Sequence, residues 1–384
     1  MLLKDHRFEK DFLEVFIENS NKYFGHLSSN LKNKEKLIDH IFLVQEYFFE
    51  LLEYHKLEPV IFSLIQNLTD EKDIQDFCAE VFVKSFAAHD FGKVNPNFQT
   101  EKMDNKIPQI VHSLYSGHSL ISGYIFSLYS ELLAKNKNFS QEKEIIIDYI
   151  SLCFSYPILK HHSPNLGNLR EDVPYQEHLE DLKKFTRNFS TFEEFDFLNQ
   201  MNEYVFSNTK NILFQKDICF IKDWFSLFAL LKLNYSLLTA SDYYATSHFM
   251  NNWQGIPDDF GILNKELKNK IIKNVETTQS FNQKTYQELD NYQLNFPAEA
   301  NATNLNKLRQ NLSFETIQGI RSNSDKNYFY IEAPTGGGKT NLSMLAVAEL
   351  LRNDINANQT SITIIFNVFQ FNTLIQQTFE PLTE

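Results

Sequence analysis

The stretch Ala88-His89-Asp90-Phe91-Gly92-Lys93 follows a run of apolar or small residues at helical spacing, namely Ile74, Cys78, Val81, Phe82 and Ser85. This spacing predicts a helix that places His89 on its buried face and stops near Gly92. Imidazole nitrogens and carboxylate oxygens both bind metals, so His89 and Asp90 form a candidate metal site. A His-Asp pair at a helix end is more often structural, and the metal interpretation therefore depends on ligand-type residues elsewhere.

Composition indicates a folded, largely helical protein. With 384 residues, the chain is long enough for two domains, each with its own core. Hydrophobic residues make up 42% and include 36 Phe, while Gly and Pro are few, which favours packed helices. The formal net charge of −13 argues against a broad nucleic-acid-binding surface. It leaves room for a local groove, because bound divalent cations supply positive charge where phosphate sits.

Nothing in the sequence indicates export or membrane insertion. Residues 1–6 do not form a secretory signal, because charge and His interrupt the apolar start. The longest apolar run, 224–238, contains Lys232 and Asn234 and is too short to span a bilayer. We therefore expect a cytoplasmic protein with no membrane contact. The cysteines lack metal-ligand or disulfide spacing and are expected to be core residues: Cys78, Cys153 and Cys219.

Two histidines precede the His-Asp pair. Residues 32–56 are predicted to form one helix, with an apolar stripe that includes Leu37 and Val44. His40 lies on that stripe and should point inward. His26 is expected in a loop before the helix.

A near-repeat follows in the predicted helix from Ile110 to Leu133. His112-Ser-Leu-Tyr-Ser-Gly is followed at once by His118-Ser-Leu-Ile-Ser-Gly. Because six residues is not a helical period, the two imidazoles should point in different directions, and at most one should reach a common centre. The spacing alone leaves open which of the two does so.

Three more ligand-type residues come at predicted helix ends. His161 and His162 follow a helix from Ile145 to Leu159, and Pro164 comes just after them. Asp242 is expected at the end of an apolar helix from Ile221 to Tyr244, where the alternative is an exposed Asp in the last turn. The polar stretch 171–215 is interpreted as a helical insertion.

Together these residues suffice for two metal ions. Asp90 is expected to bridge, with His40, His89 and Asp242 around one ion and His118, His161 and His162 around the other. Nitrogen-rich ligation favours Mn, Fe, Co or Ni, with Mg possible. Two such ions can promote displacement at a phosphodiester. Lys93 is expected either to neutralise a phosphate oxygen during catalysis or to be an ordinary solvated lysine.

The chain changes character towards its C-terminus. A polar linker is predicted over 256–304, between a domain at 1–255 and another at 305–384. Strands are predicted at 328–332 and 362–366, with a glycine loop and a helix from Thr340 to Arg352 between them. This order is the start of a parallel nucleotide-binding sheet.

The loop Ala333-Pro-Thr-Gly-Gly-Gly-Lys-Thr340 is close to the P-loop pattern and resembles motif I of superfamily-two helicases. Its glycines let backbone N–H groups surround phosphates, Lys339 reaches the β and γ phosphates of ATP, and Thr340 offers its hydroxyl to Mg²⁺. The predicted nucleotide-binding residues are Thr335, Gly336, Gly337, Gly338, Lys339 and Thr340. Because the chain stops at Glu384 before any Asp-Glu-x-His motif, we expect an incomplete helicase domain that does not hydrolyse ATP.

The segment His-Asp-Phe-Gly-Lys-Val-Asn-Pro-Asn-Phe-Gln at 89–99 resembles the HD segment of the CRISPR-associated HD nuclease–helicase of type I interference systems. The resemblance continues through His40, His118, the His161-His162 pair and Asp242, and ends in the helicase motif I. It implies a mostly α protein, with an all-helical HD domain followed by the beginning of a RecA-like domain. It also implies a metal-dependent single-stranded DNA nuclease, recruited by a crRNA-guided surveillance complex to R-loop DNA. It favours His118 over His112 as the ligand, and catalytic roles for His89, Asp90 and Lys93.

Two other interpretations stay open. An HD-type phosphohydrolase acting on nucleotides or cyclic nucleotides would share the metal centre, but the glycine loop would be unexplained. A non-catalytic HD-fold partner or nucleotide sensor would carry a metal site without turnover. A substrate panel separates the first from a nuclease, and the metal content of the purified protein tests the second.

Overall fold

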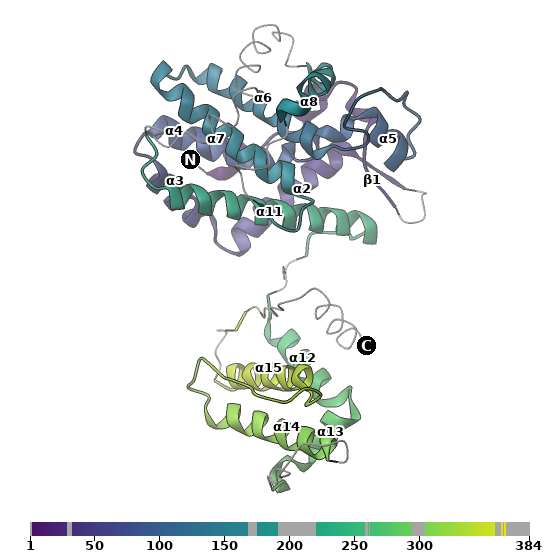
Figure 1. Cartoon of the computed structure of the whole chain (residues 1–384), viewed down its shortest axis with the longest axis vertical. Coiled ribbons are helices and arrows are strands. Elements are labelled where there is room, and N and C mark those ends of the chain that lie inside the picture. The colour runs from purple at the N-terminus through teal and green to yellow at the C-terminus, as the bar shows by residue number, and fades with distance from the viewer. Residues whose placement is uncertain are drawn as a thin grey trace. The chain divides into compact units, whose positions relative to one another are not determined.

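The computed structural model describes residues 2–28, 33–167, 175–190, 220–257, 260, 262–293, 304–357, 362, 363 and 365. Most of these residues lie in helices, which confirms the prediction of a mostly α protein. The chain divides into two compact units, Met1–Ile256 and Pro257–Glu384 (Figure 1).

The first unit consists of helices and one short antiparallel hairpin. Its helices are α1 Lys10–Phe16, α2 Leu37–Tyr54, α3 Glu58–Leu68, α4 Lys72–Ala88, α5 Pro96–Lys102, α6 Ser119–Lys137, α7 Gln141–Lys160, α8 Tyr175–Leu182 and α11 Trp224–Asn251. The hairpin pairs β1 Phe24–Leu27 with β2 Lys34–Lys36. Short 3₁₀ turns span Leu3–His6, Ser20–Lys22, Phe91–Val94 and Lys183–Asn188.

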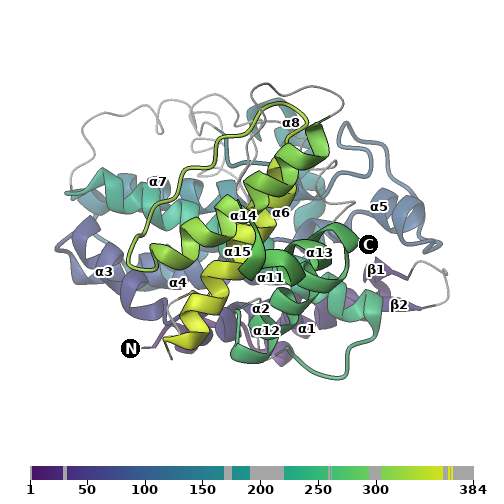
Figure 2. The same cartoon turned by 90° about the horizontal axis from the view of Figure 1, so that it is seen from below.

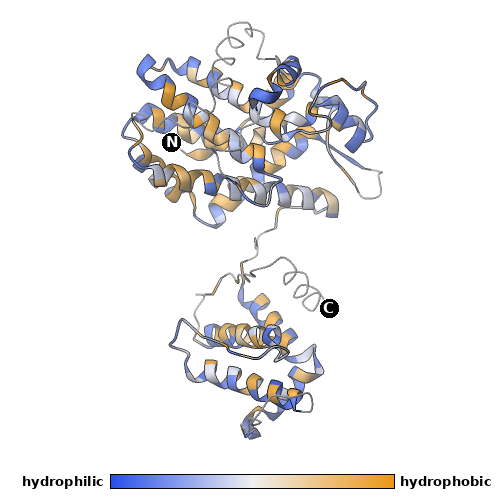
Figure 3. Cartoon of the chain, viewed as in Figure 1, coloured by the Kyte–Doolittle hydropathy of each residue, from blue (hydrophilic) through white to orange (hydrophobic). Residues whose placement is uncertain are grey.

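Helices α2, α4, α7 and α11 pack against one another to form the core of this unit, and α6 packs along α7. In both views α3 and α4 lie at one end of the unit, and β1 and α5 lie at the other (Figures 1 and 2). The stripe of α4 packs into the core as its spacing predicts, with Phe86 stacked on Phe48 of α2 at 3.7 Å between ring centroids. Hydrophobic and hydrophilic residues occupy different sides of most helices (Figure 3). The amphipathic pattern thus accounts for the bundle.

A buried polar contact ties α11 to α4. The amide of Asn234 donates to the Phe82 carbonyl at 3.0 Å and to the Ser85 hydroxyl at 2.9 Å. Cys78 and Cys153 are buried and free, as predicted for core residues, whereas Cys219 lies outside the described residues. No described helix combines the length and apolar character needed to cross a bilayer.

The N-terminal part of the predicted helix at 32–56 is wrong. Helix α2 begins at Leu37, and residues 34–36 instead form β2, in which Glu35 pairs with His26 of β1. His26 therefore lies in a strand and not in a loop. The hairpin is too short and too polar to show the alternation that identifies a strand.

The predicted start of the helix at Ile110 is also wrong, because α6 begins only at Ser119. Side chains replace the helical hydrogen bonds of the preceding loop. The Asn97 side chain bonds both the carbonyl and the N–H of Ile110, and Asn95 donates to the carbonyls of Tyr115 and Gly117. These bonds satisfy the backbone without a helix.

Helix α11 continues past the predicted end at Tyr244 and stops at Asn251, with Asn252 as a left-handed cap at φ 51°. Asp242 consequently lies inside the helix and not in its last turn. Of the predicted insertion at 171–215, α8 and Lys183–Asn188 are helical, while 171–174 and 191–215 lie outside the described residues.

The second unit packs α15 Lys339–Asn356 against α12 Lys265–Thr277 and α14 Leu305–Ser322, with α13 Ser280–Glu288 and a 3₁₀ turn at Leu289–Asn291 alongside. A buried ion pair joins Lys268 of α12 to Asp354 of α15 at 2.6 Å. Much of the predicted linker at 256–304 therefore forms helices that belong to this unit.

The predicted strand at 328–332 is absent from the structure. Tyr328 and Tyr330 are 94% and 88% exposed. No described residue pairs with this segment, and a strand needs a hydrogen-bonded neighbour. Of the second predicted strand, only 362, 363 and 365 are described, and none is in a strand. The helix after the glycine loop is present as α15.

Two carboxyl groups on the packed helices α6 and α7 have raised pKa values. Burial, together with the charge of Asp148, raises the pKa of Glu131 well above its usual value. Burial, together with the charge of Glu144, raises the pKa of Asp148 to about 7. A carboxyl whose pKa is higher in the folded than in the unfolded state makes the protein most stable at acid pH. That stability is lost as the pH rises from the unfolded pKa of about 4 towards the folded pKa.

We expect Asp148→Asn to remove this loss. Because Asp148 is half-buried, the free energy of unfolding should rise by about 1–3 kcal/mol near pH 8 and change little near pH 4. Chemical denaturation at both pH values measures the difference, with the exposed Asp11→Asn of α1 as the control. An equal gain at both pH values would contradict the expected protonation.

Candidate metal centre

The His-Asp pair lies at the point where α4 leaves the core. His89 caps the C-terminal end of α4 and is fully buried, and Asp90 leads into the 3₁₀ turn Phe91–Val94. A Cβ atom at Gly92 would lie 2.0 Å from the His118 carbonyl oxygen, so only glycine fits here. The Gly92 N–H donates to the Ser122 hydroxyl at 2.8 Å. The glycine therefore brings the start of α6 against the end of α4.

The first ligand group combines three helices. His40 of α2, His89 and Asp90 after α4, and Asp242 of α11 offer ligand atoms that all lie within 4.8 Å of one another. His40 Nε2 is 3.2 Å from Asp242 Oδ1 and 3.4 Å from Asp90 Oδ2, and His89 Nε2 is 3.3 Å from Asp90 Oδ2. Atoms that bind one ion at about 2.1 Å lie roughly 3–3.5 Å apart. These four residues can therefore hold a metal ion.

The second ligand group is formed by three histidines. His118, which precedes α6, and His161 and His162, which follow α7, also place their ligand atoms within 4.8 Å of one another. The Nε2 atoms of His118 and His162 are 3.0 Å apart. His161 is buried and His162 more open.

Asp90 lies between the two groups. Its Oδ2 atom faces His40 and His89, while its Oδ1 atom is 3.3 Å from His118 Nε2 and 3.9 Å from His161 Nε2. The structure thus brings together all seven residues that the sequence suggests as ligands. It also gives the carboxylate one oxygen for each group.

Hydrogen bonds fix the tautomers of two buried rings. His89 Nδ1 donates to the Phe86 carbonyl at 2.7 Å, and His161 Nδ1 donates to the Ile158 carbonyl at 2.6 Å. Each ring therefore directs its Nε2 atom into the centre, where neither Nε2 has a hydrogen-bond partner among the described residues. Buried, unpartnered nitrogens that converge in this way are suited to a metal ion.

His40 is held from behind by a residue that sequence reasoning missed. Glu35 Oε2 lies 3.2 Å from His40 Nδ1 and 2.9 Å from His26 Nδ1. A carboxylate behind a histidine orients the ring and makes it a better ligand. Glu35 and His26 could have been found from their pairing across the β1–β2 hairpin. The hairpin is only a few residues long, so the sequence shows no strand pattern that predicts this pairing.

The centre combines buried carboxylates with positively charged partners. The charges of Lys93 and His89 and the hydrogen bonds from histidines outweigh burial and hold the pKa of Asp90 well below its usual value. The hydrogen bond from His40 and the positive charges of His40 and His89 do the same for Asp242. Burial alone would lower the pKa of His40, but its bonds to Asp242, Asp90 and Glu35 raise it well above the usual value.

The three histidines of the second group behave differently. Burial lowers the pKa of His118, His161 and His162, and neighbouring positive rings contribute. These rings are therefore neutral and keep a lone pair for a metal. The two aspartates nearby remain anionic, so the whole centre is suited to a cation.

Lys93 is not a solvated lysine. It is 4% exposed, and its Nζ lies 2.6 Å from Asp90 Oδ2 and donates to the Gly25 carbonyl at 3.1 Å. It thus places one fixed positive charge against the shared carboxylate.

His112 lies outside both groups. Its ring hydrogen-bonds with Asn95 and Asn97 and packs edge-on against Phe185. It therefore belongs to the asparagine-held loop before α6.

The predicted phosphate loop lies in the second unit. Gly336 and Gly338 have φ values of 77° and 81°, which only glycine adopts freely, and Gly338 caps the N-terminus of α15. Lys339 and Thr340 are exposed at the first turn of that helix. Arg309 Nε donates to the Gly336 carbonyl at 2.8 Å. The exposed loop at a helix N-terminus suits an anion.

Comparison with known proteins gives no relative: no protein-family model, curated protein or solved structure matches the chain.

The two histidines of the near-repeat allow a matched test. We expect His118→Ala to lose bound Mn²⁺, because it removes a ligand from the second group, whereas His112→Ala should retain the metal and lower thermal stability. Metal analysis after dialysis, together with circular dichroism, measures both effects. Metal loss in His112→Ala with full retention in His118→Ala would reverse the assignment.

Proposed function

We propose that the unit Met1–Ile256 is a metal-dependent nuclease that hydrolyses phosphodiester bonds of single-stranded DNA with two divalent transition-metal ions. The observation that carries the proposal is Asp90, which turns one carboxylate oxygen to each of two ligand groups. Two ions roughly 3.5–4 Å apart supply charge stabilisation for both the attacking and the leaving oxygen of a phosphodiester.

The residues of the chain have distinct roles in this proposal. His40, His89 and Asp242 would hold one ion, His118, His161 and His162 would hold the other, and Asp90 would offer one carboxylate oxygen to each. Glu35 orients His40. Lys93 contacts the shared carboxylate at 2.6 Å, and its positive charge would help to neutralise the oxygens of a phosphate bound at the centre. The nitrogen-rich second group favours Mn, Co, Ni or Fe over Mg.

The choice of DNA over a nucleotide rests on the resemblance of residues 89–99 and the surrounding ligands to the CRISPR-associated HD nuclease–helicases. On this basis the substrate strand would come from R-loop DNA presented by a crRNA-guided surveillance complex, in the cytoplasm. An HD-type phosphohydrolase would use the same metal ligands, so the choice between the two needs a substrate panel.

We expect Asp90→Asn to abolish Mn²⁺-supported cleavage of single-stranded DNA. Loss of the bridging ligand disturbs both ions, and charge stabilisation worth several kcal/mol corresponds to a rate loss of about 10²–10⁴-fold. Asp39→Asn on the exposed side of α2 is the matched control and should be fully active. His89→Ala should be as inactive as Asp90→Asn while remaining folded by circular dichroism.

Mononucleotides and cyclic dinucleotides are tested in the same assay. Turnover of these small substrates without DNA cleavage would favour the phosphohydrolase. Cleavage retained by both Asp90→Asn and His89→Ala would remove the metal centre from the mechanism.

We also propose that residues 305–384 contribute the N-terminal part of a RecA-like helicase domain, in which 335–340 bind the phosphates of ATP with Mg²⁺. The positive φ angles of two loop glycines at the start of α15 support this proposal. The metal ligands and the phosphate loop belong to separate units, so the nuclease reaction should not require ATP.

Lys339→Ala tests the loop. Removing one charge-assisted contact should weaken the binding of a fluorescent ATP analogue by about 10- to 100-fold. Lys326→Ala, an exposed lysine of the same unit, is the control. Single-stranded DNA cleavage should be the same with and without ATP and in both variants. Single-stranded DNA cleavage that requires ATP and is lost in Lys339→Ala would contradict the expected independence.

A further inference from the structure

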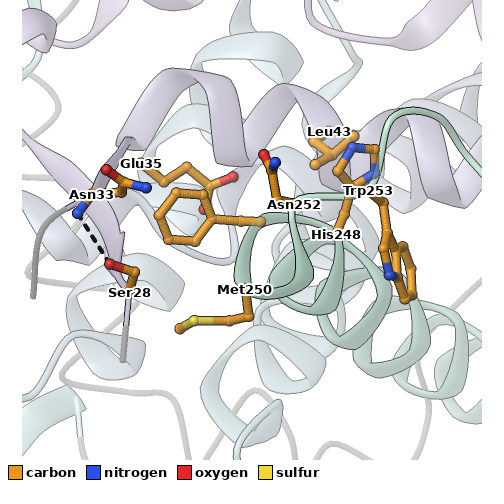
Figure 4. Close-up of a pocket in the computed structure, with 9 residues that line it drawn as sticks. Ser28, Asn33, Glu35, Leu43, His248, Met250, Asn252 and Trp253 are labelled. Carbon is orange, nitrogen blue, oxygen red and sulfur yellow. Dashed lines mark hydrogen bonds between the residues drawn. The ribbon is translucent and has the colours of Figure 1, made fainter. Parts of the chain in front are cut away.

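A cavity of about 530 Å³ lies in the first unit, where the end of α11 meets the β1–β2 hairpin (Figure 4). Its lining includes Asn33, Glu35, Phe249, Met250, Asn252 and Trp253. The volume is in the range of small-molecule sites. None of the ligand-type residues suggested by the sequence lines it.

The lining suits a flat, uncharged, nitrogen-containing ring. Phe249 and Trp253 offer aromatic faces and Met250 a thioether, while Asn33 and Asn252 offer amides that can both donate and accept hydrogen bonds. No lysine or arginine is among the described residues that line the cavity, which disfavours a phosphate as its occupant. Aromatic faces with amide edges are the features that hold an unstacked nucleobase.

The cap of α11 fixes this lining before anything binds. The Asn252 N–H donates to the Phe249 carbonyl at 3.2 Å and the Trp253 N–H donates to the His248 carbonyl at 3.0 Å. The His248 ring is held in turn by the Tyr47 hydroxyl at 2.8 Å from Nδ1. A preformed site loses less conformational entropy on binding.

The cavity is connected to the metal centre in two ways. Glu35 lines the cavity and also contacts the rings of His26 and His40. Along α11, Asp242, Thr246 and Phe249 are spaced i, i+4 and i+7, so they lie on one face of the helix. Thr246 contacts both Asp242 and His26.

Asp242 and Phe249 are about 10 Å apart along the helix axis, at 1.5 Å per residue. Nucleotides in a stacked strand repeat at about 3.4 Å, so this span corresponds to about three nucleotides.

We propose that this cavity binds a nucleobase of the single-stranded DNA whose phosphodiester lies at the metal centre. The inference rests on the proposed nuclease function and specifies how that site would select its substrate: a strand enters only if its bases can be unstacked and one of them inserted. Duplex DNA, with its bases paired and stacked, is excluded.

The two tryptophans of the chain provide a direct test. Trp253 lines the cavity, whereas Trp224 lies at the other end of α11 and is 42% exposed. Trp224→Phe leaves Trp253 as the only indole, and Trp253→Phe leaves Trp224. Each variant is titrated with a short oligothymidylate in EDTA, so that binding is measured without cleavage. We expect quenching in Trp224→Phe and none in Trp253→Phe.

A second pair of variants tests the amide edge without straining the backbone. Asn252 and Asn138 are both left-handed helix caps, at φ 51° each, and glycine adopts this conformation freely. Asn252→Gly should weaken oligothymidylate binding by about 3- to 10-fold through loss of a hydrogen bond. Asn138→Gly, at the end of α6 and outside the cavity, should bind as the wild type does.

The outcomes separate this inference from the proposed function. Quenching of Trp253 by oligothymidylate, with weaker binding in Asn252→Gly, supports the nucleobase site even if Mn²⁺ then produces no cleavage, in which case only the nuclease proposal fails. Mn²⁺-dependent cleavage without any quenching of Trp253 fluorescence would support the nuclease proposal and overturn the proposal that the cavity binds a nucleobase. Equal quenching by thymidine monophosphate and oligothymidylate would also overturn it, because the site would then bind free nucleotides.

Discussion

The first unit depends on burying one carboxylate, that of Asp90, between two sets of histidines. A lone buried carboxylate would be costly, because burial strongly disfavours its charge. Here three kinds of partner surround it: the positive Lys93 ammonium, the rings of the first group and the neutral rings of the second, of which His118 hydrogen-bonds it. Helices α2, α4 and α11 each bring ligand-type side chains to this point from a mostly apolar buried surface. The helices that form the core of the bundle therefore also determine the positions of the residues around Asp90.

A second layer holds the ligands in place. Backbone carbonyls at the ends of α4 and α7 orient His89 and His161, while Glu35 orients His40 from the hairpin. The two kinds of support differ in strength, because a helix end is fixed by the whole helix and a two-stranded hairpin is only marginally stable alone. The hairpin is tied down instead by Gln99, which bonds both the N–H and the carbonyl of Phe24. Gln99 of α5, which follows the His-Asp pair, thus holds in place the hairpin that carries Glu35.

Helical periodicity in the sequence predicts which side of each helix is buried. It gave the buried position of His89 and of His40 and the placement of His161 after its helix, because each of these follows from which side of one helix is apolar. Periodicity gave a wrong helix start where side chains distant in sequence, rather than a helix, form the hydrogen bonds of the backbone. The loop before α6 is held by Asn95 and Asn97, and such bonds leave no local pattern.

The hairpin and Asp242 show two other limits. Residues 34–36 continue a helical pattern in sequence, yet they pair with β1, and this tertiary contact outweighs local preference. Its residue type suggests Asp242 as a ligand, although the helix that carries it extends seven residues beyond the predicted end at Tyr244. The strand expected at 328–332 depended on a sheet, and no described segment supplies the neighbouring strand.

The glycine two residues after Asp90 has a consequence for the tolerance of the chain to mutation. Gly92 meets the His118 main chain, and a Cβ atom there would collide first with the His118 carbonyl oxygen at 2.0 Å and also with the Ile121 Cβ atom at 2.9 Å. A larger side chain at another position can often be accommodated by a smaller residue opposite it. No substitution removes a main-chain carbonyl oxygen. The distance between α4 and α6, and with it the separation of the two ligand groups, is set by the backbone.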